Sequence, residues 1–245
     1  PYYYNQRADF YEDQENYDEA LKDYATAMEI STDDYQTARA INNRAMIYES
    51  QEKYELAIEE YSRVINSDYK LPQINLSFTY RNLGDCYLAL EDYEKALSNF
   101  TKAIELDKEN PARYSDRADC YIAMEDYTNA LKDLDKAIEL APENPYYYNN
   151  RADFYKNQEN YDEALKDYAT AIKISTNDFQ TSRAHNNRGL VYWAQEKYAL
   201  QIEEYTKAIE IYSTAINYSN RADVYKRLEN YEKALADYTS AIDLD

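Results

Sequence analysis

The chain has 245 residues, with 31 Tyr but only 2 Gly and 5 Pro, and its formal net charge is -20. So few turn residues exclude an all-β or doubly wound fold, whereas Ala, Glu, Lys, Leu and Tyr recur at helical spacing and predict an almost entirely helical chain. The acidic surface repels phosphate backbones, which argues against a nucleic-acid partner. No apolar run approaches the ~20 residues that span a bilayer, so membrane insertion is not expected.

A tyrosine-led phrase, Y-x-x-A-[LI], recurs along the chain from Tyr17 to Tyr231. Its successive steps are 37, 39, 34, 34, 37 and 33 residues. A basic period of 34 with occasional insertions predicts stacked helical hairpins. The seven expected repeats cover approximately residues 1–34, 38–71, 77–110, 111–144, 145–178, 182–214 and 215–245. Residues 1–144 form a four-repeat block that is partly duplicated from residue 145.

The third repeat reads YRNLGDCYLALEDYEKALSNFTKAIELDKENP, and the fourth ends LDKAIELAPENP. Seven segments of this kind, in register over the whole chain, resemble the tetratricopeptide repeat family. The resemblance implies an all-α fold, a right-handed superhelical α-solenoid of helix–turn–helix repeats. No low-complexity linker divides the chain, so we expect one solenoid over residues 1–245.

Small and large residues alternate in columns that predict how the hairpins pack. The small column on the first helices consists of Ala8, Ala45, Gly84, Ala118, Ala152, Gly189 and Ala222. These small residues act as packing notches where the backbones of two helices approach. Tyrosines fill the spaces between the notches, so their role is predicted to be structural. Insertions before repeats two, three and six should tilt the stack or extend a helix. The segment EIYSTAINYSN, without Pro or Gly, predicts a tight, nearly continuous turn before repeat seven.

A second pair of columns combines arginine on the first helix with an acid on the second. Six repeats carry both residues, whereas repeat three has Leu83 and Asn99 at these positions. Because repeat three lacks the arginine and the acid together, we predict that the two residues form a partly buried structural pair in the other repeats.

No catalytic constellation is present in the sequence, and neither is a phosphate-binding glycine loop nor a metal-spaced Cys/His set. We therefore expect no enzyme activity, no cofactor and no metal. His185 occupies a tyrosine column and is interpreted as a packing substitute. Cys86 and Cys120 fall in equivalent places on neighbouring helices, about 10 Å apart, too far for a disulfide. Two buried thiols favour a reducing compartment such as the cytoplasm, although the sequence does not give the location.

The resemblance implies that the first helices line a concave groove where peptides or partner segments lie. Regularly spaced amides there could bind a peptide backbone, or could instead bond between adjacent repeats. A column of acids biases the groove toward basic ligands, and Leu190 with Trp193 is expected to form an apolar spot. The candidate peptide-binding residues are Asn5, Asp9, Asn42, Asn43, Arg81, Asn82, Asp85, Asp119, Asn149, Asn150, Asp153, Asn186, Asn187, Leu190, Trp193, Asn220 and Asp223.

One variant of the family binds the carboxylate tail of heat-shock chaperones with lysines, arginines and asparagines. The corresponding positions here are Asn5, Asp9, Asn43, Phe78 and Asn82, and only Asn43 matches. Acids in place of cations should repel a carboxylate, which argues against this ligand.

The sequence thus predicts a noncatalytic protein–protein interaction scaffold that binds an extended, basic or neutral peptide segment in an acidic, Asn-rich groove. Two alternatives stay open. The chain could be a self-assembling array that associates end to end through uncapped end repeats, or it could be the regulatory arm of a larger enzyme.

Overall fold

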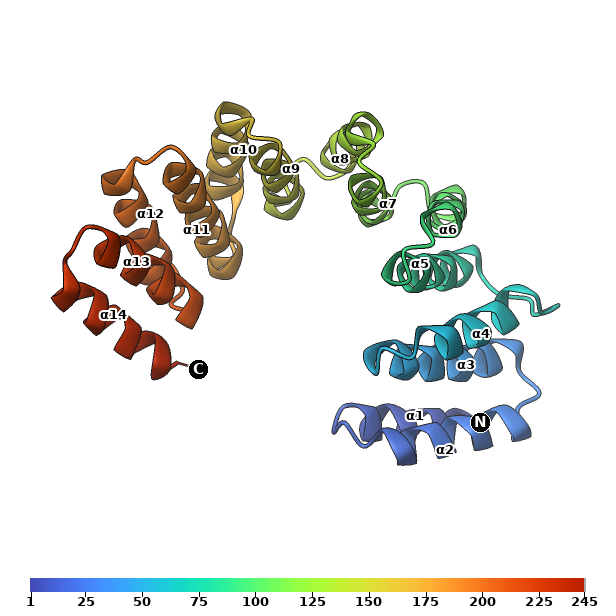
Figure 1. The fold of residues 1–245 in the computed structure, drawn as a ribbon. Helices are drawn as coiled ribbons and strands as arrows, with labels where there is room; N and C mark the ends of the chain where they lie inside the picture. Colours follow the sequence, from blue (N-terminus) through green and yellow to red (C-terminus); the bar gives the residue numbers. More distant parts are fainter. Residues whose placement is uncertain (245) are drawn as a thin grey trace. The chain divides into compact units, whose positions relative to one another are not determined.

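The structure, a computed structural model, describes residues 1–244. Over these residues it contains fourteen α-helices in seven helix–turn–helix pairs and no strand, which confirms the all-α prediction (Figure 1). None of these helices is both long enough and apolar enough to cross a bilayer. The helices are α1 Tyr2–Glu12, α2 Tyr17–Ile30, α3 Asp34–Ser50, α4 Tyr54–Ile65, α5 Gln73–Ala89, α6 Tyr93–Leu106, α7 Pro111–Ala123, α8 Tyr127–Leu140, α9 Pro145–Asn157, α10 Tyr161–Ile174, α11 Asp178–Ala194, α12 Tyr198–Ile211, α13 Ala215–Arg227 and α14 Tyr231–Ile242.

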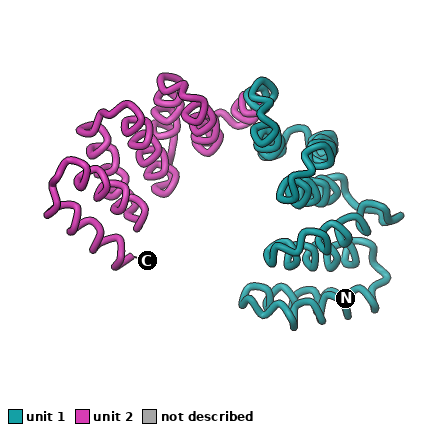
Figure 2. Tube along the Cα trace, in the orientation of Figure 1, with its two compact units in different colours: residues 1–133 teal, residues 134–245 magenta. Residues whose placement is uncertain are grey.

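The chain divides into two compact units, residues 1–133 and residues 134–245, and the division falls inside α8 (Figure 2). Within unit 1, α1 packs on α2 and α2 on α3, and the first helices α1 and α3 also touch. Within unit 2, α9 packs on α10 and α10 on α11, and α9 also touches α11. Helices α3 and α11 therefore each contact their own partner helix and both helices of the preceding repeat.

The insertions predicted to alter the joints lengthen the first helices. Helices α3, α5 and α11 each have 17 residues, whereas α1 has 11 and α9 has 13. The loop between α12 and α13 has only three residues, so the predicted turn is tight. The helix is not nearly continuous there, because Tyr212 and Thr214 are extended and the Thr214 side chain caps the amide of Asn217.

The turn between the two helices of each repeat contains one residue with a left-handed backbone conformation. In repeat four the amide of Asp126 donates to the carbonyl of Tyr121 at 2.9 Å, and the amide of Glu125 to the carbonyl of Ile122 at 3.0 Å. These are the two bonds of a Schellman motif, whose left-handed position usually belongs to glycine. Here glutamate occupies it in all seven repeats, at Glu15, Glu52, Glu91, Glu125, Glu159, Glu196 and Glu229.

The small residues act as the predicted notches. A Cβ atom added at Gly84 would lie 2.7 Å from the ring of Phe100, and one at Gly189 would lie 2.4 Å from the ring of Tyr205. On the second helices, the rings of Tyr24, Tyr61, Tyr168 and Tyr205 are buried. This confirms the structural role of these tyrosines. Cys86 and Cys120 are buried free thiols, as expected.

The predicted arginine–acid pairs are confirmed within each of the six repeats. Arg151 is representative, since its Nε and Nη2 atoms donate to the two carboxylate oxygens of Asp167 at 2.7 and 2.9 Å. The six pairs are Arg7 with Asp23, Arg44 with Glu60, Arg117 with Asp133, Arg151 with Asp167, Arg188 with Glu204 and Arg221 with Asp237.

His185 is more than a packing substitute, because its Nδ1 lies 2.8 Å from Oε2 of the buried Glu204.

Candidate functional site

Several of the candidate groove residues are hydrogen-bonded around the hydroxyl of Tyr24, where repeat one meets repeat two. This hydroxyl donates to Oδ1 of Asp9 at 2.7 Å, and Asn43 donates to the same carboxylate oxygen at 3.0 Å. Arg39 forms an ion pair with the other oxygen of Asp9. Both oxygens of Asp9 are therefore occupied, and this carboxylate joins two repeats.

The same cluster recurs where repeat five meets repeat six. The Tyr168 hydroxyl bonds to Asp153, Asn187 donates to Asp153 Oδ1 at 2.8 Å, and Arg183 donates to Asp153 Oδ2 at 2.8 Å. Arg183 also donates to the side-chain Oδ1 of Asn150 at 3.4 Å. Burial and the Asp153 carboxylate raise the pKa of Tyr168, so this phenol stays protonated as a donor.

Sequence reasoning missed Arg39 and Arg183, which neutralise Asp9 and Asp153. Both arginines lie near the start of the lengthened helices α3 and α11, at the second position of repeats two and six. The recurrence of T-A-R-A and T-S-R-A in the two inserted joints was the available signal.

The remaining second-helix tyrosines are the buried Tyr61 and Tyr205 and the half-buried Tyr238, and only Tyr238 uses the same groove-acid position. Tyr61 donates to Glu49 at 3.0 Å, because the groove acid is replaced by Met46 in repeat two. In repeat six, Gln201 donates to the Tyr205 hydroxyl at 3.2 Å. In repeat seven, Tyr238 donates to Asp223 at 2.5 Å. Asp9, Asp153 and Asp223 thus accept hydrogen bonds from tyrosine hydroxyls, and this structural role accounts for these three acids.

Repeats three and four carry the groove acids Asp85 and Asp119 without such a tyrosine. The corresponding second-helix residues are Phe100 and Leu134, which have no hydroxyl. Asp85 instead forms an ion pair with Arg81 at 2.9 Å. These two acids are therefore the members of the column that the packing of a tyrosine does not explain.

The carboxyl group of Asp85 lies in an unfavourable place for a charge. Burial raises its pKa to about 7, and the nearby carboxylates of Asp116 and Glu49 add to the effect, while Arg81 acts in the opposite direction. Arg81 is shared, because its Nε atom also lies 3.3 Å from Asp116. Burial likewise raises the pKa of Glu49. This part of unit 1 therefore gathers more carboxyl groups than cations.

Two adjoining cavities lie between α3 and α5, and together we call them the α3–α5 groove. They have volumes of about 420 and about 480 Å³ and share Met46, Arg81 and Asn82. The lining combines exposed apolar side chains with amides and charges. The first cavity is lined by Tyr35, Ala38, Arg39, Asn42, Asn43, Met46, Leu71, Asn75, Phe78, Thr79, Arg81 and Asn82. The second is lined by Met46, Glu49, Ser50, Tyr54, Arg81, Asn82, Asp85 and Ala89.

The predicted amide column is used mainly between adjacent repeats. Asn5 and Asn149 are fully buried and donate to Gln36 and Gln180, respectively, of the following repeat. The partly exposed amides also bond across repeats: Asn42 to Thr79 at 3.0 Å, Asn82 to Tyr61 at 3.3 Å and Asn220 to Asn186 at 2.9 Å. These amides therefore align the repeats.

The predicted apolar spot in unit 2 borders a small cavity. Leu190 and Trp193 line it together with Gln201, Tyr205, Asn220 and Asp223, around a volume of about 110 Å³. The Arg227 guanidinium lies 4.9 Å from the Trp193 ring centre and covers part of that ring. Sequence reasoning missed this contact because Arg227 comes from the next repeat.

Comparison with solved structures finds several chains of similar fold. A tetratricopeptide repeat protein from Parabacteroides merdae ATCC 43184 is 20% identical over 98% of this chain and 91% of that chain, with a TM-score of 0.72. The structure of pilF from Pseudomonas aeruginosa is 23% identical over 69% and 76%, with a TM-score of 0.60. A chain of the APC/C hetero-tetramer Cut9-Hcn1 is 15% identical over 85% and 40%, with a TM-score of 0.62.

No curated protein matches the sequence. Family models described as tetratricopeptide repeat match residues 2–70 and 145–214 with one model, and residues 77–110, 111–144 and 215–245 with three others. The chain therefore belongs to the tetratricopeptide repeat family.

Proposed function

We propose that the chain is a noncatalytic scaffold that holds an extended peptide segment, basic or neutral in character, against the first helices of its repeats. Family membership supports a protein-interaction role. One solved neighbour is a chain of the APC/C hetero-tetramer Cut9-Hcn1, an assembly of different chains. The proposal places the principal contact on the α3–α5 groove and on the acids beside it.

The observation that carries the proposal is the state of Asp85. Its pKa of about 7 means that the folded chain keeps an acid where ionisation is unfavourable. A lysine or arginine of a bound peptide would supply the missing positive charge and restore ionisation. Asp119, 34 residues further on in the sequence, would offer a second carboxylate to the same segment.

The rest of the groove suits an extended backbone. The amides of Asn43 and Asn82 lie beside the exposed side chains of Met46 and Phe78. Apolar side chains of a peptide could cover those two residues, while its backbone bonds to amide oxygens and nitrogens that retain unused lone pairs or protons. Neutral peptides would use only these contacts and therefore bind more weakly than basic ones.

Fluorescence anisotropy with labelled basic, neutral and acidic peptide pools tests the proposal. The basic pool should bind most tightly, and added salt should weaken its binding. The double variant Asp85→Asn with Asp119→Asn should lose about tenfold in affinity for basic peptides, equivalent to about 1.4 kcal/mol. Asp18→Asn, an exposed acid on α2, makes the same kind of charge change and should have little effect.

Affinity for basic peptides should also rise between pH 6 and pH 8, because Asp85 ionises in this range. Absence of binding by every pool would contradict the proposal. So would a double variant that binds basic peptides as tightly as the unchanged protein.

A further inference from the structure

Repeat six differs from its duplicated counterpart, repeat two, at two positions beside a buried tyrosine. Repeat two has Glu49 and Ala57 there, and the hydroxyl of Tyr61 donates to Glu49 at 3.0 Å. The equivalent positions of repeat six hold Trp193 and Gln201. Repeat six therefore loses the acid that accepts from the tyrosine hydroxyl and gains an indole and an amide.

The amide of Gln201 is buried and only half used. Gln201 is 2% exposed, and its Nε2 atom donates to the Tyr205 hydroxyl at 3.2 Å. Its Oε1 atom has no hydrogen-bond partner among the residues that the structure describes. A buried acceptor without a donor costs free energy, so packing alone does not account for this glutamine. The other six repeats have an alanine at this position, namely Ala20, Ala57, Ala96, Ala130, Ala164 and Ala234.

Gln201 borders a cavity between repeats six and seven that has room for a donor group. Its volume of about 110 Å³ exceeds the ~30 Å³ that one water molecule takes up in the liquid. It is well below the roughly 300–1,000 Å³ of pockets for drug-sized ligands. The cavity therefore suits the end of one side chain or a small unbranched molecule. It is lined by Leu190, Trp193, Gln201, Tyr205, Asn220 and Asp223.

The corresponding place in unit 1 also holds a cavity. Met46 and Asp85 border it, at the repeat positions that Leu190 and Asp223 hold in unit 2. That cavity lies between repeats two and three, which have further repeats on both sides. An opening at this position is therefore a feature of the repeat itself.

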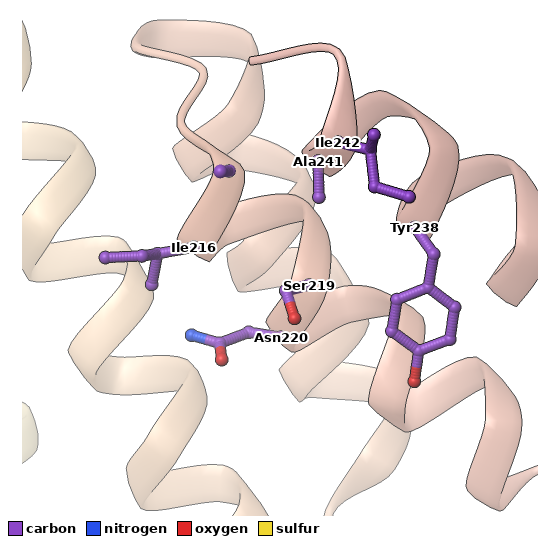
Figure 3. Close-up of a pocket in the computed structure, with 7 residues that line it drawn as sticks. Ile216, Ser219, Asn220, Tyr238, Ala241 and Ile242 are labelled. Carbon is purple, nitrogen blue, oxygen red and sulfur yellow. The ribbon is translucent and has the colours of Figure 1, made fainter. Parts of the chain in front are cut away.

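Negative charge reaches the cavity of repeat six from α13. Asp223 is held in place by the Tyr238 hydroxyl, which donates to its Oδ1 atom at 2.5 Å. Figure 3 shows Tyr238 on α14 and Asn220 on α13, which also border a separate cavity of about 550 Å³. Burial raises the pKa of Tyr205 and the charge of Asp223 adds to the increase, while the bond from Gln201 acts in the opposite direction. The cavity therefore favours a cationic donor.

The apolar walls suit an aliphatic stem next to that cation. Leu190 is half-buried, and the Trp193 ring has a face that attracts positive charge. The Arg227 guanidinium already lies 4.9 Å from the ring centre of Trp193, so this indole holds a cation. Because Arg227 covers part of the ring and the cavity is small, a compact ammonium fits better than a second planar guanidinium.

We infer that this cavity binds a primary ammonium group on an unbranched aliphatic stem, carried by a lysine of a peptide or by a free alkylamine. The ammonium donates to Gln201 Oε1 near the Asp223 carboxylate, and the stem packs against Leu190 and Trp193. The terminal torsion of a glutamine side chain is soft, so the amide turns toward the ligand at little cost. The site is separate from the α3–α5 groove and does not depend on it.

Fluorescence of Trp193, the only tryptophan of the chain, reports occupancy of the cavity. Titration of the full chain with n-butylammonium chloride should give a saturable change with a dissociation constant in the millimolar range, because few atoms make contact. Sodium butyrate and sodium chloride at the same concentrations should give none. Nα-acetyl-lysine amide distinguishes the two sources. Tighter binding than that of n-butylammonium indicates a lysine of a peptide, and weaker binding indicates a free alkylamine.

Gln201→Ala tests the acceptor. The variant has the alanine of the other six repeats and keeps Trp193 as the reporter. It should bind n-butylammonium about tenfold more weakly, because the ammonium loses a buried acceptor. Gln73→Ala, at the exposed first residue of α5, is the matched control and should bind as tightly as the unchanged protein.

Circular dichroism checks that both variants keep their helical content. Equal binding by Gln201→Ala and the unchanged protein, saturable binding of butyrate in place of the amine, or no saturable response to either amine would each overturn the inference. The double variant Asp85→Asn with Asp119→Asn should keep the n-butylammonium response. Failure of the α3–α5 groove proposal and failure of this site are therefore measured independently.

Discussion

Repeats five and three share their two-helix architecture but differ at three linked positions. Repeat five has Arg151, Asp167 and Tyr168, whereas repeat three has Leu83, Asn99 and Phe100. In repeat five the arginine pairs with one acid and the tyrosine bonds to the groove acid Asp153. In repeat three neither arrangement exists, and the groove acid Asp85 has a pKa of about 7. The comparison indicates that repeat five pairs its polar residues between helices, whereas the groove acid of repeat three pairs with Arg81 on its own helix.

The largest expected effect comes from removing one half of the buried pair in repeat five. Arg151→Leu should lower the free energy of unfolding by about 3 kcal/mol, because it leaves the buried Asp167 without its bidentate partner. Arg151→Leu together with Asp167→Asn reproduces the residues of repeat three and should cost less. Urea unfolding followed by circular dichroism measures both, and equal losses would contradict the pairing.

Removing the acid in repeat three should alter the pH dependence of stability. The folded-state pKa of Asp85, about 7, lies above its ordinary value of 3.8, so its contribution is most favourable below pH 4 and is lost as pH rises toward 7. Asp85→Asn should therefore stabilise the protein at pH 8 by about 2 kcal/mol and should change little at pH 4. Thermal unfolding at the two pH values measures the difference. A variant that is destabilised at pH 8 would show that the Arg81 ion pair dominates.

Converting repeat three toward repeat five should give a smaller stabilisation. Phe100→Tyr should place a hydroxyl near Asp85, as Tyr24 does for Asp9, and should lower the pKa of Asp85 by stabilising its ionised form. We expect about 1 kcal/mol of added stability at pH 8. An NMR pH titration of the Asp85 carboxyl carbon measures the pKa.

Phe179→Tyr, at an exposed ring in unit 2, is the matched control and should leave that pKa unchanged. An unaltered pKa in Phe100→Tyr would mean that the missing hydroxyl does not cause the difference between the repeats.

The smallest effect is expected at the turn inside each repeat, where all seven repeats have a glutamate in the left-handed conformation. Glu125 has a φ of 59°, a left-handed conformation that glycine adopts without steric cost. Glu125→Gly should raise the free energy of unfolding by about 0.5 kcal/mol, since the relief of strain exceeds the added freedom of the unfolded chain. Glu59→Gly, in the exposed middle of α4, should instead lower it by about 1 kcal/mol. Urea unfolding distinguishes them, and destabilisation by both substitutions would show that the turn is unstrained.

The repeat period predicted the helices, the notches at Gly84 and Gly189, and the arginine–acid pairs. These features depend on contacts within one repeat or on a column that recurs, so a single sequence contains enough copies to reveal them. The glutamate turns show the limit of this reasoning. These turns have glutamate where a Schellman motif usually has glycine, so the residue types do not indicate the motif. Only the backbone conformation identifies it.

The candidate site could be predicted less completely. The sequence placed Asp9, Asp85 and Asp153 in one column, but it did not show that Arg39 and Arg183 occupy two of them. Those contacts join different repeats, and arginine occurs at this position only in repeats two and six, so it forms no column along the chain. Glu49 was likewise missed, because it contributes to the groove from only one repeat.

The Asp9 and Asp153 clusters each draw side chains from two successive repeats, and this links the opening of one repeat to that of its neighbour. When α3 separates from α1, Asp9 loses Asn43 and Arg39 together, and the Tyr24 hydroxyl loses the Asn43 amide that donates to it. Amide protons of repeats one and two should therefore exchange with solvent as one cooperative block, and those of repeats five and six as another. Neighbouring hairpins tied in this way resist fraying from an end more strongly than their individual helices would.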